Sequence, residues 1–402
     1  FGSRGQLAQF QPQESPSCPA WPLMLCMLRS SAAVRRTVWP VRMLPATRGL
    51  SGMRAALYHE FRGPLTVVEV PRPRVPVDGV VVEVVATGLC RSDWHGWQGH
   101  DGDIRSLPHV PGHELAGVVA EVGDDVARFK RGDRVVVPFI LSCGACGECT
   151  SHGRPTTCEA QLQPGFHLWG SYAQYVALPR ADRNLAHLPS GVSFGAGASI
   201  GCRFSTAYRA VAVRAALRPG EWLCVLGCGG LGLASVAVGK ALGARVAACD
   251  VRPSALRRAA ELGADVVLDA GDDERLRAEV RAATGGGAHA AVDAAGWAAS
   301  ARNAVHVLRR GGRMVQAGLP LGEHADPGIP MALVAAWELV LLGSHGADAN
   351  DLRQLLAMVE QRSLRPDALI TSELSLSDAC KSLMAMGPAS PDGVHMIVDF
   401  QS

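Results

Sequence analysis

The chain has 402 residues, of which 48% are hydrophobic and 19% charged, and its formal net charge is +2. This balance is typical of a globular protein with a sizeable core, and the length suggests about two or three domains. No basic block alternates with aromatic residues, and no apolar run approaches the roughly 18 residues of a membrane span. Neither nucleic acid nor a membrane is therefore an expected partner.

Residues 1–52 differ in composition from the rest of the chain. They contain six arginines, one acidic residue and scattered serines and prolines, with no periodic pattern. This composition is typical of an organelle transit peptide, and a cloning remnant or a translated upstream region is the alternative. We expect a cytoplasmic protein, or an organellar one if this leader is a transit peptide, with globular sequence beginning at Met53.

The next part of the chain, to about residue 182, reads as a mostly β domain. Valine-rich runs at residues 80–85, 115–122 and 133–137 are bounded by glycine or aspartate and predict strands.

From about Gly220 the pattern changes to alternating strands and helices. Strands are predicted at residues 222–226, 245–249, 265–268, 290–294 and 313–317, and helices at 231–242 and 254–262. Alternation of this kind favours a doubly wound parallel sheet. Leucines near residue 355 follow a helical period close to the C-terminus.

Residues 227–232 read Gly-Cys-Gly-Gly-Leu-Gly and match the Gly-x-Gly-x-x-Gly pattern of dinucleotide-binding turns. The pattern follows a predicted strand and opens a predicted helix, where backbone N–H groups can bind a pyrophosphate. Its glycines are Gly227, Gly229, Gly230 and Gly232. Asp250 ends the next strand, where a carboxylate binds the ribose hydroxyls of NAD and repels the 2′-phosphate of NADP. Arg252 could accommodate that phosphate, so NADP stays an alternative.

Four closely spaced cysteines give a strong metal signal. They are Cys143, Cys146, Cys149 and Cys158. Two successive Cys-x-x-Cys steps let thiolates converge on one ion, and four sulfurs complete the closed shell of a structural zinc. The spacing suits a metal better than disulfides and so indicates a reducing compartment. Four free thiols in a loop are the alternative.

Three further segments contain metal-ligating residue types. Cys90, His113 and Cys202 together offer two thiolates and one imidazole, which leaves the fourth position of a zinc open for substrate. A zinc there would act as a Lewis acid on an alcohol oxygen. Taken singly, each could be an ordinary buried residue, and Asp93 and Glu114 could be surface acids.

The joint pattern resembles a family. The runs Cys-Arg-Ser-Asp-x-His, Gly-His-Glu, the four-cysteine lobe, Gly-Cys-x-Phe-Ser-Thr and Gly-x-Gly-Gly-x-Gly occur here in the order found in zinc-containing medium-chain alcohol dehydrogenases. The resemblance extends from Met53 to the C-terminus. It implies that Cys90, His113 and Cys202 bind a catalytic zinc and that the four-cysteine lobe binds a structural zinc, giving two zinc ions per chain.

The resemblance also implies roles for neighbouring residues. Glu114 lies behind the catalytic zinc and ligates it transiently, and Asp93 orients His113. Ser92 accepts the alcohol proton and passes it through the cofactor ribose to His95. In the cofactor site, the expected contacts are Arg91 at the pyrophosphate and Thr206 near the nicotinamide.

The implied fold is α/β. A doubly wound parallel-sheet (Rossmann) cofactor domain, residues 204–342, joins a mostly β, GroES-like catalytic domain, residues 53–203 and 343–402, whose structural zinc lobe spans 143–158. The implied reaction is the reversible oxidation of a small-molecule alcohol to an aldehyde or ketone with NAD. The short span between the last lobe cysteine and Cys202 resembles compact forms that assemble as tetramers, so a homo-oligomer, a tetramer rather than a dimer, is expected.

The aromatic residues Trp97, Phe139 and Trp169 are candidates to line the alcohol pocket, and ordinary core packing is the alternative for each. An aromatic side chain is equally suited to a substrate pocket and to the hydrophobic core.

Two departures from the family pattern are visible. Eight residues separate Cys149 from Cys158 where the family usually has seven, so Gly153 absorbs the extra residue as a bulge or His152 competes as fourth ligand. The family often carries a basic residue near the final strand, where this chain has Gly393-Val-His395.

Two rival functions stay open. One is an aldehyde reductase, for example a dehydrogenase of a glutathione adduct of formaldehyde, on the same scaffold. The other is a non-catalytic zinc-binding module built on the four-cysteine lobe, against which the intact set around Cys90 argues.

Overall fold

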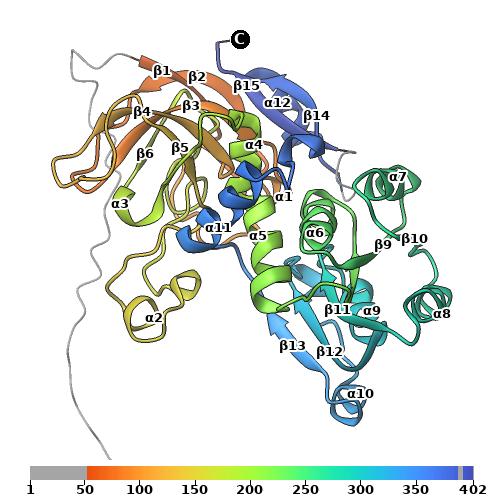
Figure 1. Ribbon diagram of the computed structural model, residues 1–402. Coiled ribbons are helices and arrows are strands. Elements are labelled where there is room, and N and C mark those ends of the chain that lie inside the picture. Colours follow the sequence, from red (N-terminus) through yellow and green to blue (C-terminus); the bar gives the residue numbers. More distant parts are fainter. Residues whose placement is uncertain (1–51, 388–392, 402) are drawn as a thin grey trace, which may run out of the picture. The chain divides into compact units, whose positions relative to one another are not determined.

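The computed structural model describes residues 52–387 and 393–401 (Figure 1). The predicted leader, apart from its last residue, lies outside the described residues. Among the described residues, no helix is both long enough and apolar enough to cross a membrane.

The first large sheet combines strands from both ends of the described chain. Figure 1 shows the blue C-terminal strands next to the orange strands near residue 80, and β15 pairs antiparallel with β3. In spatial order the strands are β14 (Ile370–Ser375), β15 (Val394–Asp399), β3 (Val80–Gly88), β4 (Leu115–Val122), β5 (Arg134–Val137) and β7 (Ala186–His187), with β6 (Tyr175–Leu178) also paired to β3. A separate antiparallel pair consists of β1 (Gly52–Leu57) and β2 (Thr66–Pro71).

The second sheet is entirely parallel. Its order is β10 (Val266–Asp269), β9 (Arg245–Asp250), β8 (Trp222–Leu226), β11 (Ala288–Asp293), β12 (Leu308–Gln316) and β13 (Val340–Gly343). This order reverses between β8 and β11, which is the arrangement of a doubly wound dinucleotide-binding sheet.

Helices cover both faces of the parallel sheet, so alternate strand residues enter two different cores. Leu223 and Val225 of β8 pack on one face with α6 (Gly230–Ala241) and α7 (Pro253–Glu261). Cys224 of the same strand packs on the other face with α8 (Asp273–Thr284) and α9 (Ala298–His306). Burial on both faces explains why the strands read as continuous apolar runs.

The remaining helices are mostly short. They are α1 (Arg91–Trp97), α2 (Gly147–Thr150), α3 (Ala181–Asn184), α4 (Phe194–Ser199), α5 (Ser205–Tyr208), α10 (Met331–Ala336), α11 (Ala349–Glu360) and α12 (Leu376–Met384). Between α4 and α5 the chain keeps its helical course through a π-helical segment, η2 (Ile200–Phe204), and a second such segment, η3 (Arg209–Arg214), follows α5. Single π-helical turns inside α-helices are frequent at functional sites.

The predicted mostly β region and the predicted parallel sheet are both confirmed. The strand predicted at 80–85 extends to Gly88, and the helix predicted at 231–242 begins one residue earlier, at Gly230. The helical course from Phe194 to Arg214 was not predicted from the sequence.

Candidate functional site

Two cysteines, a histidine and a glutamate come together beside α1, β4 and η2. Cys90 immediately precedes α1, His113 and Glu114 precede β4, and Cys202 lies in η2. Each offers a ligand atom, and these four atoms all lie within 4.8 Å of one another. Two sulfurs and an imidazole around one point are a donor set that zinc favours.

Asp93 holds His113 in an orientation that suits a metal ligand. The Asp93 carboxylate lies 2.9 Å from Nδ1 of His113 and also accepts a hydrogen bond from the Gly112 backbone N–H at 3.0 Å. The ring's other nitrogen, Nε2, is buried and has no hydrogen-bond partner among the described residues. A buried polar atom without a partner costs free energy, and a metal ion bound at Nε2 removes that cost. The residues therefore fit a zinc ion.

The electrostatics of the cluster also suit a cation. The hydrogen bond from Cys202, together with the field of His113, lowers the pKa of the Cys90 thiol well below its usual value. The same hydrogen bond and burial raise the pKa of the Cys202 thiol. Burial lowers the pKa of His113, but Asp93 and Cys90 outweigh it and raise that pKa well above its usual value. The cluster therefore holds protons that a divalent cation would displace.

Glu114 is paired with an arginine that the sequence motifs had not singled out. Nε of Arg203 lies 3.1 Å from Oε1 and 3.0 Å from Oε2 of Glu114, and Nη2 also donates to Oε2. Both side chains are buried. Burial raises the pKa of Glu114 to about 7, against the opposing field of Arg203.

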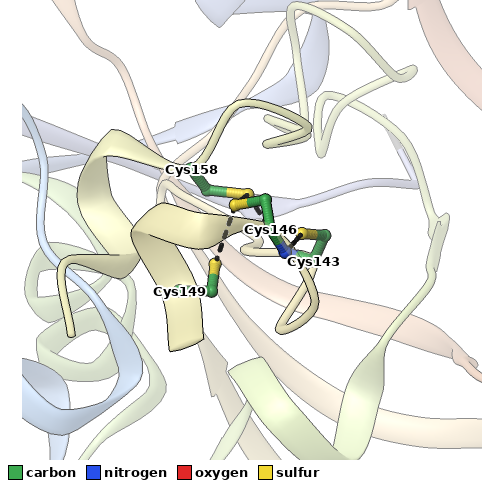
Figure 2. A group of neighbouring side chains, drawn as sticks. All are labelled: Cys143, Cys146, Cys149 and Cys158. Carbon is green, nitrogen blue, oxygen red and sulfur yellow. Dashed lines mark hydrogen bonds between the residues drawn. The ribbon is translucent and has the colours of Figure 1, made fainter. Parts of the chain in front are cut away.

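The four lobe cysteines converge on one point, as Figure 2 shows. Three of them surround the start of α2, and Cys158 follows the short helical turn Pro155–Thr157. Their four Sγ atoms lie within 4.8 Å of one another, and Sγ of Cys146 is 3.6 Å from Sγ of Cys149 and 3.8 Å from Sγ of Cys158. None of these four cysteines is in a disulfide, so all four sulfurs can bind zinc as thiolates.

Backbone N–H groups point at the lobe sulfurs. Ala145 and Cys146 donate to Sγ of Cys143 at 3.3 and 3.4 Å. Slight burial raises the pKa of the Cys143 thiol, but these donors prevail and lower it to about 6. His152, the alternative ligand, is exposed and lies 3.0 Å from a Glu148 carboxylate oxygen. Gly153 has a φ of +62°, a turn conformation that accommodates the extra residue in this segment.

The glycine-rich turn lies between β8 and α6. Gly227 has a φ of +90°, which favours glycine. A Cβ added to Gly232 would lie 1.7 Å from the carbonyl oxygen of Gly227, so only glycine fits there. At Gly229 a Cβ would meet no atom within 4 Å. The turn therefore leaves open space for a phosphate next to the N-terminus of α6.

Asp250 ties the glycine-rich turn to the end of β9. Its carboxylate accepts hydrogen bonds from the backbone N–H groups of Cys228 at 2.7 Å and Arg252 at 2.9 Å. Nε of Arg252 also lies 3.1 Å from Oδ1 of Asp250. The carboxylate that favours NAD and the guanidinium that would favour NADP are thus paired with each other.

The other two predicted cofactor residues lie on short helices. Arg91 begins α1, donates from Nη1 to the Gly387 carbonyl at 2.7 Å and places its guanidinium 4.5 Å from the Trp94 ring. Thr206 is buried in α5, and α5 packs against α6.

Ser92 and His95 both lie on α1, half-buried. Nδ1 of His95 lies 3.1 Å from Nδ1 of the exposed His100, a neighbour that no sequence motif had indicated. Burial and the field of Arg91 lower the pKa of His95 to about 4, so its ring is neutral at neutral pH. A neutral ring can accept a proton on one side and release one on the other.

The three aromatic candidates for the pocket occupy different places. Phe139 packs 5.1 Å from the His113 ring, and Phe166, which the sequence did not reveal, packs 5.4 Å from it. Trp97 is a core residue whose Nε1 donates to the Gly63 carbonyl, which agrees with the core-packing alternative for this side chain. Trp169 packs against the same core.

Comparisons with known proteins agree with this geometry. Residues 77–190 match the family described as alcohol dehydrogenase GroES-like domain, and residues 230–361 match the zinc-binding dehydrogenase family. An alcohol dehydrogenase of Geobacillus stearothermophilus is 36% identical over 317 residues, which cover 78% of this chain and 90% of that protein. An NAD-dependent alcohol dehydrogenase of Sulfurisphaera tokodaii is 31% identical over 340 residues, or 82% of this chain and 95% of that protein.

Solved structures give the same result. A crystal structure of an NAD-dependent alcohol dehydrogenase aligns with a TM-score of 0.77 and 33% identity over 86% of this chain and 99% of its own. The chain therefore belongs to the zinc-dependent alcohol dehydrogenases of the medium-chain dehydrogenase/reductase family.

Proposed function

We propose that the chain catalyses the reversible oxidation of a small-molecule alcohol to an aldehyde or ketone, with NAD as cofactor and a catalytic zinc at Cys90, His113 and Cys202. The observation that carries this proposal is the buried Nε2 of His113, which has no partner among the described residues and belongs to a ring that Asp93 orients from its other side. Two sulfurs and a carboxylate converge with it.

Residues of the chain have separate roles in the proposed reaction. When bound, zinc supplies a Lewis acid that lowers the pKa of the alcohol hydroxyl, and NAD supplies the hydride acceptor. Ser92 would receive the alcohol proton, and His95, whose ring is neutral at neutral pH, would accept it at the end of the proton path. Phe139 and Phe166 pack against the His113 ring and exclude water from that side of the imidazole.

The cofactor binds at the glycine-rich turn in this proposal. The N-terminus of α6 and the open space at Gly229 receive the pyrophosphate. Asp250, at the end of β9, accepts hydrogen bonds from the ribose hydroxyls, which favours NAD over NADP. Arg91 and Thr206 complete the predicted contacts.

The activity is tested by following nicotinamide absorbance with NAD and a panel of alcohols. We expect alcohol-dependent NADH formation in the wild type, loss of it in Cys90→Ala, and retention of it in Cys380→Ala, which alters a buried cysteine in α12 outside both clusters. Turnover only of aldehydes with NADH would favour the reductase alternative. No turnover in either direction by zinc-loaded protein would contradict the proposal.

We propose a second zinc in the four-cysteine lobe, giving two zinc ions per chain. Elemental analysis of purified protein should find close to two, and Cys146→Ser should remove the lobe zinc while the zinc at Cys90 remains. A wild-type value near one would contradict the second site.

Three finer expectations stay predictions. We propose that the chain forms a homo-oligomer, a tetramer rather than a dimer. The proposed oligomer is supported by β13, an edge strand of the parallel sheet. β13 exposes Val340 and Leu341, and an exposed apolar edge strand can pair with another chain. We also propose domain boundaries near residues 203 and 343, and a cytoplasmic location, or an organellar one if the leader is a transit peptide.

A further inference from the structure

Arg203 lies between the metal ligands and the glycine-rich turn. It directly follows Cys202 in η2, and its side chain is only 6% exposed. An arginine buried to this degree needs anionic or polar partners for its donors. On one side of the guanidinium, Nε and Nη2 donate hydrogen bonds to the Glu114 carboxylate. Nη2 also donates to the Leu89 carbonyl, at 3.4 Å.

On its other side Arg203 meets the glycine-rich turn. Its Nη1 lies 3.1 Å from the position that a Cβ on Gly230 would take, and Gly230 is the first residue of α6. None of the described residues accepts a hydrogen bond from this nitrogen. Nη1 carries two of the guanidinium's five N–H donors, and here they are placed beside free backbone N–H groups of a helix N-terminus.

Other arginines near the turn already have partners. A small pocket is lined by Cys228, Gly229, Arg252, Arg258 and Gly393, among others. Arg252 pairs with Asp250, and Nη2 of Arg258 donates to the carbonyls of Ala368 and Leu369.

The final strand adds no cation to this pocket. Gly393 contributes no side chain, and β15 contains neither lysine nor arginine. Its one basic residue, His395, is kept neutral, because burial and the field of Arg203 lower its pKa. Arg203 is thus a buried cation whose Nη1, without an acceptor among the described residues, lies beside the turn.

We propose that Arg203 is a shared cation, which binds the pyrophosphate of the dinucleotide through Nη1 while Nε and Nη2 hold Glu114 beside the metal ligands. Guanidinium groups bind phosphates with strong, directional hydrogen bonds, and one group can serve two anions at once. Cofactor binding and the position of Glu114 are therefore coupled through one side chain. This inference rests on the proposed cofactor site at the glycine-rich turn.

The test measures ligand affinity on the zinc-loaded protein, independently of turnover. Dissociation constants for ADP-ribose, which keeps the pyrophosphate, and for adenosine, which lacks it, are determined by calorimetry. We expect Arg203→Met to weaken ADP-ribose binding by about 10–100-fold, the usual worth of a charged hydrogen bond, and to leave adenosine binding unchanged.

A double variant separates phosphate binding from support of Glu114. Arg203→Met alone leaves the buried Glu114 without its cation, which can harm folding. Arg203→Met combined with Glu114→Gln removes both charges, and we expect ADP-ribose binding to stay weak in it. Recovery of wild-type affinity in the double variant would mean that Arg203 serves Glu114 alone and would overturn the proposal.

Two further measurements complete the test. Glu114→Gln alone frees the guanidinium and should bind ADP-ribose at least as tightly as the wild type. The control Arg209→Met removes a nearby arginine that pairs with Asp351 at 2.6 Å, and it should bind normally. A wild type that binds no ADP-ribose would overturn the cofactor site itself, whereas normal binding by every variant would overturn only the role of Arg203.

Discussion

Asp93 shows how one buried side chain sets the geometry of a ligand. It is 1% exposed and accepts hydrogen bonds from both the backbone and the imidazole of the Gly-His-Glu run. The Nδ1 proton of the imidazole is thereby fixed toward Asp93, and Nε2 is left as the nitrogen that a metal can bind. A carboxylate in this position also makes the bound imidazole a stronger ligand.

Asp93→Asn should weaken zinc binding at the catalytic site by about 10–100-fold, because the amide can hold the opposite tautomer of His113. Competition with a chromophoric chelator measures this loss. Asp103→Asn, at a partly exposed aspartate next to His167, is the control. Equal zinc affinity of Asp93→Asn and the wild type would show that Asp93 does not position the ligand.

His109 makes stability depend on pH. It is 3% exposed, its Nε2 lies 2.9 Å from the Gly165 carbonyl oxygen, and burial lowers its pKa to about 4. The unfolded chain therefore binds a proton at His109 at a higher pH than the folded chain does. The free energy of unfolding falls as the pH drops below the unfolded pKa and continues to fall until about pH 4.

For His109 alone, this loss amounts to about 2 kcal/mol between neutral pH and about pH 5. His109→Gln keeps an N–H donor for Gly165 but does not titrate. Between the two pH values, the free energy of unfolding of this variant should therefore fall by about 2 kcal/mol less than that of the wild type. Urea denaturation of both proteins at the two pH values measures the difference. Parallel pH dependence of the two proteins would exclude His109 as the source.

At the scale of elements, the helical course through α4, η2 and α5 shows packing overriding local preference. It contains Gly195, Gly197 and Gly201, which are poor helix formers. A Cβ at Gly201 would lie 2.6 Å from the Val137 carbonyl oxygen, and one at Gly197 would lie 3.0 Å from the Ala116 side chain. The glycines allow the helix to approach the sheet closely and so deliver Cys202 to the metal ligands.

The glycine-rich turn permits a paired prediction. Gly232→Ala forces a Cβ against the Gly227 carbonyl and should destabilise the protein without ligand by about 1–3 kcal/mol. Gly229→Ala meets open space, so stability should stay near that of the wild type while NADH binding weakens, because the methyl group enters the proposed phosphate site. Thermal unfolding and NADH fluorescence titration distinguish the two effects. Equal destabilisation by both substitutions would contradict this account.

At the scale of the whole molecule, the parallel sheet ends in an exposed strand. β13 lies at one edge, and its Val340 is 44% and its Leu341 37% exposed. Exposed edge strands with apolar residues favour pairing with another chain.

Val340→Lys should shift the protein to a smaller species, because a lysine at this edge opposes strand pairing. Sedimentation velocity measures the change. Val77→Lys is a control, since that valine is 59% exposed but lies between β2 and β3, outside the parallel sheet. A wild type that sediments as a monomer would contradict the proposed oligomer, and unchanged sedimentation of Val340→Lys would exclude this edge.

The sequence by itself determined the family, the two kinds of sheet and the local motifs. Cys143, Cys146 and Cys149 are close in the chain, and the glycine-rich turn needs only one strand and one helix. Such features depend on spacing along the backbone, so their chemistry can be predicted without a fold.

Only the tertiary structure decided which distant side chains meet. Glu114 and Arg203 are 89 positions apart and belong to no common motif, yet they form a buried ion pair. Trp97 entered the core while Phe139 and Phe166 packed on His113. Contacts of this kind depend on how helices and strands pack in three dimensions. A buried charge needs an opposite charge or hydrogen-bond partner, and a buried ring must pack closely against whichever side chains the fold places beside it.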